Sequence, residues 1–136
     1  MQNILIDAGP LIALFDRSDQ YHTRAVEFIK DFQGYLWTTW PVVTEVCHML
    51  DFSTKSQCAF LEWIKRGGVR IFRLEEIHLE KLVALTEKFD DVPMDLADAS
   101  LVVAGEEKSF AEIASIDSDF YIYRDLRNKY LTNVFV

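Results

Sequence analysis

Short apolar runs of the strand type alternate with longer segments of helical periodicity, and this alternation constrains the fold more than any other feature of the chain. Strands separated by helices are typical of a parallel sheet with helices on both faces. The expected strands are residues 3–6, 35–38, 69–72, 111–116 and 133–136. We therefore predict an α/β fold in which residues 1–136 form a single domain, with a five-stranded parallel sheet flanked by helices.

The segments between these strands carry helix signals. Gly9-Pro10 predicts a turn after the first strand, followed by one or two turns of helix. Pro41 stands where helices often begin. Longer helices are expected over residues 20–33, 41–50, 53–66, 75–89 and 93–105, with a short helical turn near Phe120.

The composition is that of an ordinary globular domain. Half of the 136 residues are hydrophobic and 26% are charged, which excludes a disordered chain. The longest apolar runs are shorter than the roughly 18 residues that a membrane span needs, and the first residues lack the basic segment of a signal peptide. Cys47 and Cys58 show no metal-ligand spacing, as expected of reduced thiols in a cytoplasmic protein.

The net charge of −8 argues against binding of nucleic acid by general electrostatic attraction. An excess of carboxylates gathered in one pocket would instead attract a divalent metal. Asp7 follows the first predicted strand, and Asp117 follows the strand predicted at 111–116. Ligand sites of open parallel sheets lie just beyond the carboxyl ends of the strands, so both aspartates are candidate site residues.

The segment "PMDLADASLVVAG" (93–105) places two aspartates at the head of an apolar helix. Asp95 suits the N-cap position and Asp98 the third helical position, an acidic form of the capping box. The helix is apolar nearly all round, so we expect it to be buried and to carry Asp98 inside. We expect Asp95 to cap and Asp98 to bind metal. Glu45, at the margin of an apolar helix face, is expected to be half-buried.

No basic residue stands beside these four acids in the sequence to neutralise them. Four carboxylates converging in one pocket would repel one another and raise their pKa values unless a cation were present. Ligation by oxygen atoms alone suits Mg²⁺ or Mn²⁺. Such ions promote phosphodiester hydrolysis by activating water and stabilising charge on the phosphate, so metal-assisted cleavage of phosphoesters is the favoured function.

Four motifs carry a resemblance to a known family. In chain order they are "LIDAGPLIALFDRSDQYH", "PVVTEV", "VPMDLADASLVVAGE" and "IASIDSDFYIYR". Their order and spacing resemble the PIN domain, specifically the ribonuclease toxin of a VapBC-type toxin–antitoxin pair, over essentially the whole chain. The resemblance implies a nuclease domain that cuts RNA (tRNA, rRNA or mRNA) with Mg²⁺ or Mn²⁺. It also implies a small antitoxin protein as partner and a homodimer.

The resemblance also implies roles for individual residues. Asp7, Glu45, Asp98 and Asp117 would be the four acidic ligands in chain order, and Asp119 an accessory carboxylate. Ser115 stands where the family often has a threonine. The family often follows its first aspartate with a hydroxyl residue, whereas this chain has Ala8 and Gly9; one contact around the site is thereby lost, while all four carboxylates are in place.

Two arginines, Arg17 and Arg124, follow the first and the last acidic motif closely enough to be candidates for contact with a substrate phosphate. Solvated surface charge is the competing interpretation of both. The three histidines, His22, His48 and His78, lack ligand spacing and are interpreted as surface or packing residues.

Two alternatives can be weighed from the sequence. A phospho-accepting receiver domain would need an aspartate after its third strand, where this chain has Arg73-Leu74, and a lysine after its fifth, where the chain ends. The stronger alternative is a PIN-like scaffold that binds RNA or a protein partner without cutting. Loss of a carboxylate would indicate such a scaffold, and none is lost.

Overall fold

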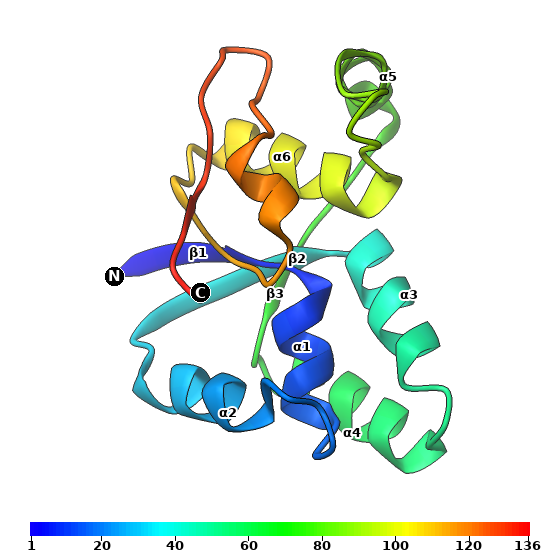
Figure 1. The fold of residues 1–136 in the computed structure, drawn as a ribbon, viewed down its shortest axis with the longest axis vertical. Coiled ribbons are helices and arrows are strands. Elements are labelled where there is room, and N and C mark those ends of the chain that lie inside the picture. Colours follow the sequence, from blue (N-terminus) through cyan, green and yellow to red (C-terminus); the bar gives the residue numbers. More distant parts are fainter.

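The computed structural model describes residues 1–136 and places all five strands in one parallel sheet (Figure 1). The strand order is β3-β2-β1-β4-β5. The strands are β1 (Gln2–Ile6), β2 (Gly34–Thr39), β3 (Arg70–Phe72), β4 (Glu112–Ala114) and β5 (Thr132–Asn133). The predicted α/β fold with a five-stranded parallel sheet is confirmed.

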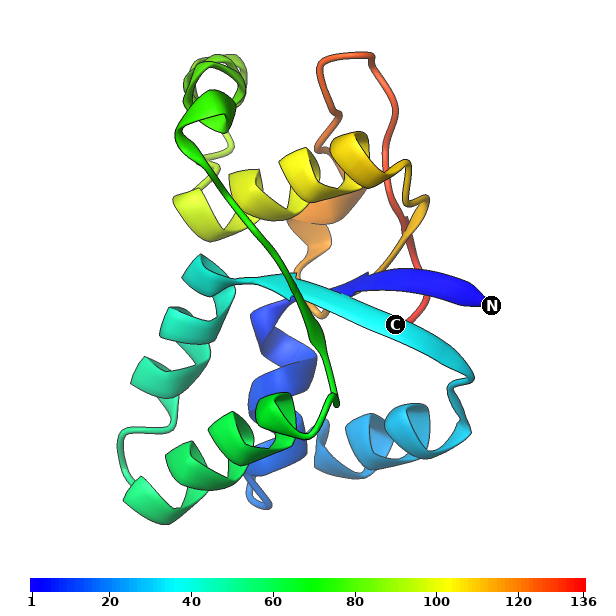
Figure 2. The same cartoon turned by 180° about the vertical axis from the view of Figure 1, so that it is seen from behind.

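Helices cover both faces of this sheet, as Figures 1 and 2 show. One face carries α1 (Ala8–Phe15), α2 (His22–Asp31), α3 (Trp40–Met49) and α4 (Thr54–Lys65). The other carries α5 (Leu79–Lys88) and α6 (Leu96–Lys108). Two short 3₁₀ helices complete the chain, η1 (Glu76–His78) and η2 (Ser118–Tyr121).

The predicted turn at Gly9-Pro10 is wrong, because α1 already begins at Ala8. Pro10 is the third residue of this helix. Proline has no backbone N–H, and at this position the N–H would have no partner within the helix, so the helix loses no hydrogen bond. Asp7 therefore stands directly between the end of β1 and the start of α1. This direct passage from strand to helix holds the Asp7 side chain at the edge of the sheet.

The last two strands are shorter than predicted, because the side chain of Asn133 takes over hydrogen bonds of the ladder. The amide oxygen of Asn133 accepts from the backbone N–H groups of Ser115 and Phe135, and its NH₂ group donates to the Ser115 carbonyl. Strand β4 consequently ends at Ala114, so Asp117 lies beyond a bend rather than directly after the strand.

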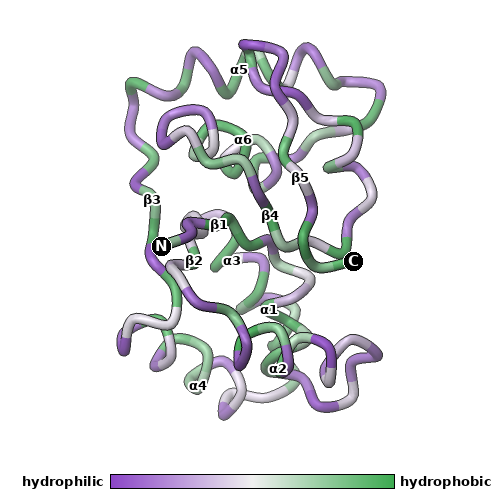
Figure 3. The backbone as a smooth tube through the Cα atoms, turned by 90° about the vertical axis from the view of Figure 1, so that its left-hand side faces the viewer, coloured by the Kyte–Doolittle hydropathy of each residue, from purple (hydrophilic) through white to green (hydrophobic).

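The core lies on both faces of the central strands. Leu5 of β1 and Ile113 of β4 are fully buried, and every residue of α6 from Ala97 to Gly105 is buried. Figure 3 shows this concentration of hydrophobic residues around α6 and the sheet. The burial of α6 is as predicted, and it takes Asp98 into the interior. None of the helices has the length and apolar character needed to cross a membrane.

Candidate metal centre

Three aspartates converge at the carboxyl edge of the sheet. Each of Asp7, Asp98 and Asp117 offers one carboxylate oxygen, and the three oxygens lie within 4.8 Å of one another. Asp7 comes from the junction of β1 and α1, Asp98 from the first turn of α6, and Asp117 from the bend before η2. The site thus joins three segments that are far apart in the sequence.

Asp7 is only 6% exposed, and no lysine, arginine or histidine pairs with it. Its backbone N–H donates to the Ala114 carbonyl at 3.0 Å, which ties the residue to β4. Burial raises the pKa of its carboxyl group to about 6, and the nearby Glu45 and Asp117 contribute in the same direction. Hydrogen bonds from the Ala8 N–H and from Ser115 offset part of this increase.

Ser115 links two of the three carboxylates. Its hydroxyl group donates to Oδ2 of Asp7 at 3.0 Å and accepts from the backbone N–H of Asp117 at 2.9 Å. The residue is fully buried, and its own backbone is held by Asn133. Ser115 therefore orients the Asp7 carboxylate and positions the Asp117 backbone. A hydroxyl group is what the family resemblance leads us to expect at this position.

Asp98 is held by its helix terminus and by a tyrosine. Its backbone N–H donates to Oδ1 of Asp95 at 2.8 Å, and its Oδ2 accepts from the Asp95 N–H at 3.4 Å, which completes the predicted capping box. The Tyr123 hydroxyl donates to the same Oδ2 at 3.2 Å. Burial, followed by the charges of Asp95 and Asp7, raises the pKa of the Asp98 carboxyl group well above its ordinary value.

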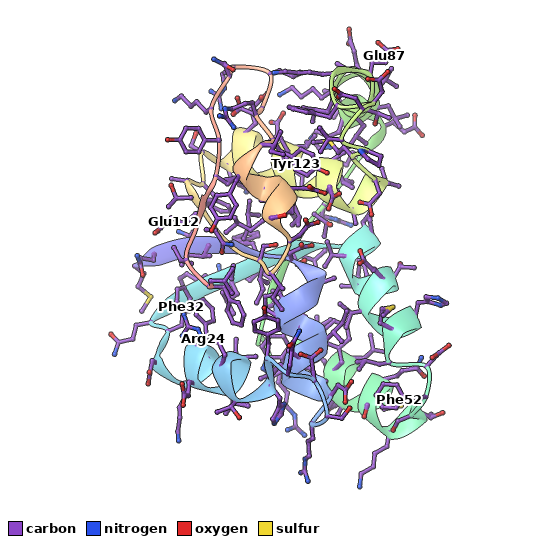
Figure 4. The ribbon with its side chains drawn as sticks, viewed as in Figure 1. Arg24, Phe32, Phe52, Glu87, Glu112 and Tyr123 are labelled. Carbon is purple, nitrogen blue, oxygen red and sulfur yellow. The ribbon has the colours of Figure 1, made fainter.

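Tyr123 is a residue of the site that the sequence does not predict. The residue is 2% exposed and lies beside α6 (Figure 4). Its ring packs edge-on against Phe89 and Phe120. Burial and the neighbouring Asp98 carboxylate raise the pKa of its hydroxyl group, which therefore remains a hydrogen-bond donor. The segment "DFYIYR" has no periodicity that distinguishes this tyrosine from the exposed Tyr121, so no signal in the sequence identifies it.

Glu45 and Asp119 lie at the margin of the cluster. Glu45 is exposed, so the prediction that it is half-buried is wrong. Its carboxyl group is nevertheless partly shielded from water, and this shielding raises its pKa, as do the charges of Asp95 and Asp117. Partial shielding and Asp117 also raise the pKa of Asp119, whose backbone N–H donates to Oδ1 of Asp117 at 2.9 Å. Neither residue is within the three-oxygen cluster.

The chain supplies no cation to these acids. Its four ion pairs all lie elsewhere, and every buried side-chain polar atom has a hydrogen-bond partner. Carboxylates that are buried together without a counter-charge are unstable in their ionised form. A divalent ion with oxygen ligands removes this repulsion. The residues present therefore fit a metal centre, with Asp7, Asp98 and Asp117 as the convergent donors.

The two arginines proposed for phosphate contact have other surroundings. Arg17 follows the far end of α1, a helix that spans roughly 12 Å at 1.5 Å per residue. Arg124 donates to the carbonyls of Tyr121, Ile122 and Tyr123, which end η2. Both positions suit the competing interpretation better than contact with a phosphate at the cluster.

The histidines behave as packing or surface residues. Nδ1 of His22 lies 2.7 Å from the Ala13 carbonyl, and Nδ1 of His78 accepts from the Glu75 N–H. His48 is exposed one turn beyond Glu45 on α3.

The parallel five-stranded sheet and the acidic cluster at its carboxyl edge place this chain among α/β proteins with a candidate metal site. Within this class, residues 4–126 match the PIN domain, and the chain belongs to the PIN domain family. No curated protein matches the chain significantly in sequence.

Solved structures support the fold at low sequence identity. The chain is similar to the sarcin–ricin-loop-cleaving toxin VapC20 of Mycobacterium tuberculosis, with 18% identity, a TM-score of 0.81, and coverage of 88% of this chain and 93% of that one. It is also similar to a toxin–antitoxin complex from Klebsiella pneumoniae, with 19% identity, a TM-score of 0.65, and coverage of 86% of this chain and 89% of that one. A third similar structure is VapBC2 from Rickettsia felis, bound to a promoter DNA fragment. The identity is 11%, the TM-score is 0.65, and the match covers 97% of this chain and 98% of that one.

Proposed function

We propose that this protein is a metal-dependent endoribonuclease that hydrolyses phosphodiester bonds of RNA. The observation that carries the proposal is the convergence of Asp7, Asp98 and Asp117 without any cation from the chain. Membership of the PIN domain family and similarity to a toxin that cleaves the sarcin–ricin loop support it. The nuclease unit comprises residues 1–136, and its substrate is a tRNA, rRNA or mRNA.

The three convergent aspartates would hold Mg²⁺ or Mn²⁺, whose oxygen preference matches this donor set. When bound, the ion lowers the pKa of water and stabilises negative charge on the phosphate and the leaving oxygen. Ser115 and Tyr123 hold the Asp7 and Asp98 carboxylates in position through their hydroxyl groups. Such outer hydrogen bonds orient metal ligands and tune their basicity.

Glu45 and Asp119 act from the margin of the cluster. The charge of Glu45 raises the pKa of Asp7, and the charge of Asp117 raises the pKa of Glu45, as is expected of neighbouring carboxylates. A carboxylate with a raised pKa close to a reacting water can accept a hydrogen bond from it and take up a proton. We assign this orienting role to Glu45, and to Asp119 an accessory role beside Asp117.

The partners follow from the same proposal. A ribonuclease of this kind needs restraint, and two structurally similar proteins are a toxin–antitoxin complex and VapBC2. We infer that the chain is the toxin of such a pair, bound by a small antitoxin protein, and that it forms a homodimer. Expression of the complete locus should give a complex of toxin and antitoxin. Purification of the chain alone, as a monomer with no partner encoded beside it, would contradict this assignment.

The test of the activity is cleavage of total tRNA and rRNA by purified protein in Mg²⁺, in Mn²⁺ and in EDTA, with Asp7→Asn in parallel. We expect discrete fragments that require metal and disappear in the variant. Metal binding should be measured separately by calorimetry. Neither cleavage nor metal binding would favour a scaffold that binds RNA or protein without cutting.

A further inference from the structure

Trp40 differs from the other two tryptophans of the chain in having no aromatic neighbour. Trp37 packs on Phe110 and donates its indole N–H to Asn3, and Trp63 packs against Phe15 and Phe60. Trp40 makes no such contact, its indole N–H has no partner in the chain, and the residue is 57% exposed. An exposed indole offers a large, flat, apolar surface on which a planar ligand can stack.

The sheet register places Trp40 beside the metal centre. Strands β1 and β2 pair in parallel with Leu5 opposite Trp37, so that Asp7 stands level with Thr39 and Trp40 lies one residue further along. Neighbouring strands are about 4.8 Å apart. Trp40 therefore begins α3 at the same sheet edge where Asp7, the N-cap residue, precedes α1.

The backbone under Trp40 is firmly held. The Thr38 hydroxyl donates to the Ile6 carbonyl at 2.9 Å, and the Thr39 hydroxyl shares a 2.6 Å hydrogen bond with Ser100 of α6. Both threonines are fully buried. A ligand that stacks on the indole would meet a rigid support, which lowers the entropic cost of binding.

The indole lines an open groove together with Glu45 and Asp95, two acids whose charges act on the pKa values of the clustered aspartates. The groove lies between the N-terminal turns of α3 and α6, and it includes Glu45, His48, Asp95 and Leu96 with Trp40. No lysine or arginine lines it. The surface therefore has no permanent cation to attract phosphate, so a contact with RNA here relies on uncharged groups. The π-face of an exposed indole provides such a contact, because base stacking needs no opposite charge.

We propose that Trp40 is the stacking platform for a nucleobase of single-stranded RNA next to the phosphate that is cut, an inference that rests on the proposed ribonuclease function. A protein chain that brings no cation of its own is a poorer occupant of this groove. It would bury Glu45 and Asp95 without a cation from this chain and would cover the side of the acidic cluster on which Glu45 lies.

Binding of fluorescein-labelled oligoadenylate and oligouridylate tests the proposal. Fluorescence polarisation should be measured with Mn²⁺ present and in an Asp98→Asn background, so that the RNA is not cut. Trp40→Ala should weaken binding by about 5-fold to about 150-fold, the range for loss of one base–aromatic stack. The salt dependence of the dissociation constant should not change, because no charge is removed. Trp40→Phe should restore most of the affinity.

The matched control is Ile77→Ala, which removes a side chain that is 80% exposed on η1, outside the groove. It should bind both oligonucleotides like the parent. Saturating RNA should also quench tryptophan emission in the parent, and this quenching should be lost in Trp40→Phe even though binding is retained. A merely structural role of Trp40 would not separate quenching from affinity in this way.

Three results would overturn the proposal. Equal affinity of Trp40→Ala and its parent would show that the indole does not stack on RNA, and so would failure of the parent to bind either oligonucleotide. Conversion of a dimer to a monomer by Trp40→Ala, seen by light scattering, would identify the groove as a subunit interface. Metal-dependent cleavage of total RNA by the unmodified chain is the separate readout: if it persists, the ribonuclease function stands although the stacking role fails.

Discussion

The two ends of helix α6 differ in whether the chain supplies a counter-charge to their acidic residues. At the C-terminal end, Nζ of Lys81 lies 2.6 Å from Glu106 and 2.7 Å from Glu107, and this lysine lowers the pKa of Glu107. At the N-terminal end, Asp98 faces Asp7 and Asp117 without a cation, and its pKa is raised. Where the chain supplies a counter-charge, the acids serve the fold. Where it supplies none, they are left for a ligand.

The helix dipole does not explain this difference. The positive N-terminal end of α6 favours Asp98, but by only about 1 kcal/mol. Burial of the side chain and the charges of Asp95 and Asp7 act in the opposite direction and dominate, since the pKa is raised rather than lowered. The comparison therefore teaches that charge pairing, not position on the helix, distinguishes a structural carboxylate from a candidate metal ligand.

The largest effect should come from removing the Asp98 charge at the N-terminal end of α6, where the acids have no counter-charge. We expect Asp98→Asn to lower metal-dependent cleavage of RNA by about 100-fold or more, the scale on which loss of one stabilising group lowers catalysis. The metal-free variant should have a higher melting temperature at pH 8 than the parent, because a repelled buried charge is gone. Glu107→Gln is the control at the paired end and should leave cleavage unchanged; full activity of Asp98→Asn would refute the site.

The next effect is the pH dependence of stability. The pKa of Asp7 is about 6 in the folded state and 3.8 as its ordinary value, so folding favours the protonated form. The associated stability is present below the ordinary pKa and is lost as pH rises through about 6, by about 3 kcal/mol at most. Urea unfolding in EDTA should show this decline. Added Mn²⁺ should largely abolish it, and an equal decline with Mn²⁺ would argue against binding at these acids.

A smaller effect is expected from the hydroxyl group that holds Asp98. Tyr123→Phe keeps the buried ring and removes the hydrogen bond to Oδ2. Metal affinity should fall by about 10-fold to 100-fold, the usual result of losing such a supporting contact. Calorimetric titration with Mn²⁺ measures it. The matched control is Tyr121→Phe on the exposed neighbouring tyrosine, and identical affinities in the two variants would show that Tyr123 is only a packing residue.

The smallest effect should come from removing the ion pairs of Lys81 at the C-terminal end of α6. Lys81→Met leaves Glu106 and Glu107 without their cation and should destabilise the fold by about 1 kcal/mol or less, because the ion pairs are partly exposed to solvent. Chemical unfolding at low and high salt checks this, since salt should reduce the difference. Metal affinity should not change. A loss of metal binding in Lys81→Met would mean that the two ends of α6 are coupled.

Local features of the site could be predicted because they depend on residues close together in the chain. The capping box of Asp95 and Asp98 needs only a spacing of three residues at a helix start. Asp7 needs only the end of a strand, and the alternation of strands and helices predicted the sheet that brings strand ends together. The predicted bounds failed at β4 and β5, where the side chain of Asn133 replaces backbone pairing.

The sequence by itself determined the α/β class, the parallel sheet and the acids at its carboxyl edge, because strand periodicity, helix caps and strand ends are local properties. Only the tertiary structure decided which hydroxyl groups hold those acids, since the contacts of Ser115 with Asp7 and of Tyr123 with Asp98 join distant segments. It also decided that Glu45 is exposed and that Trp40 alone of three tryptophans lacks an aromatic partner. Burial of a side chain depends on what packs against it, and the chain's local pattern does not specify that.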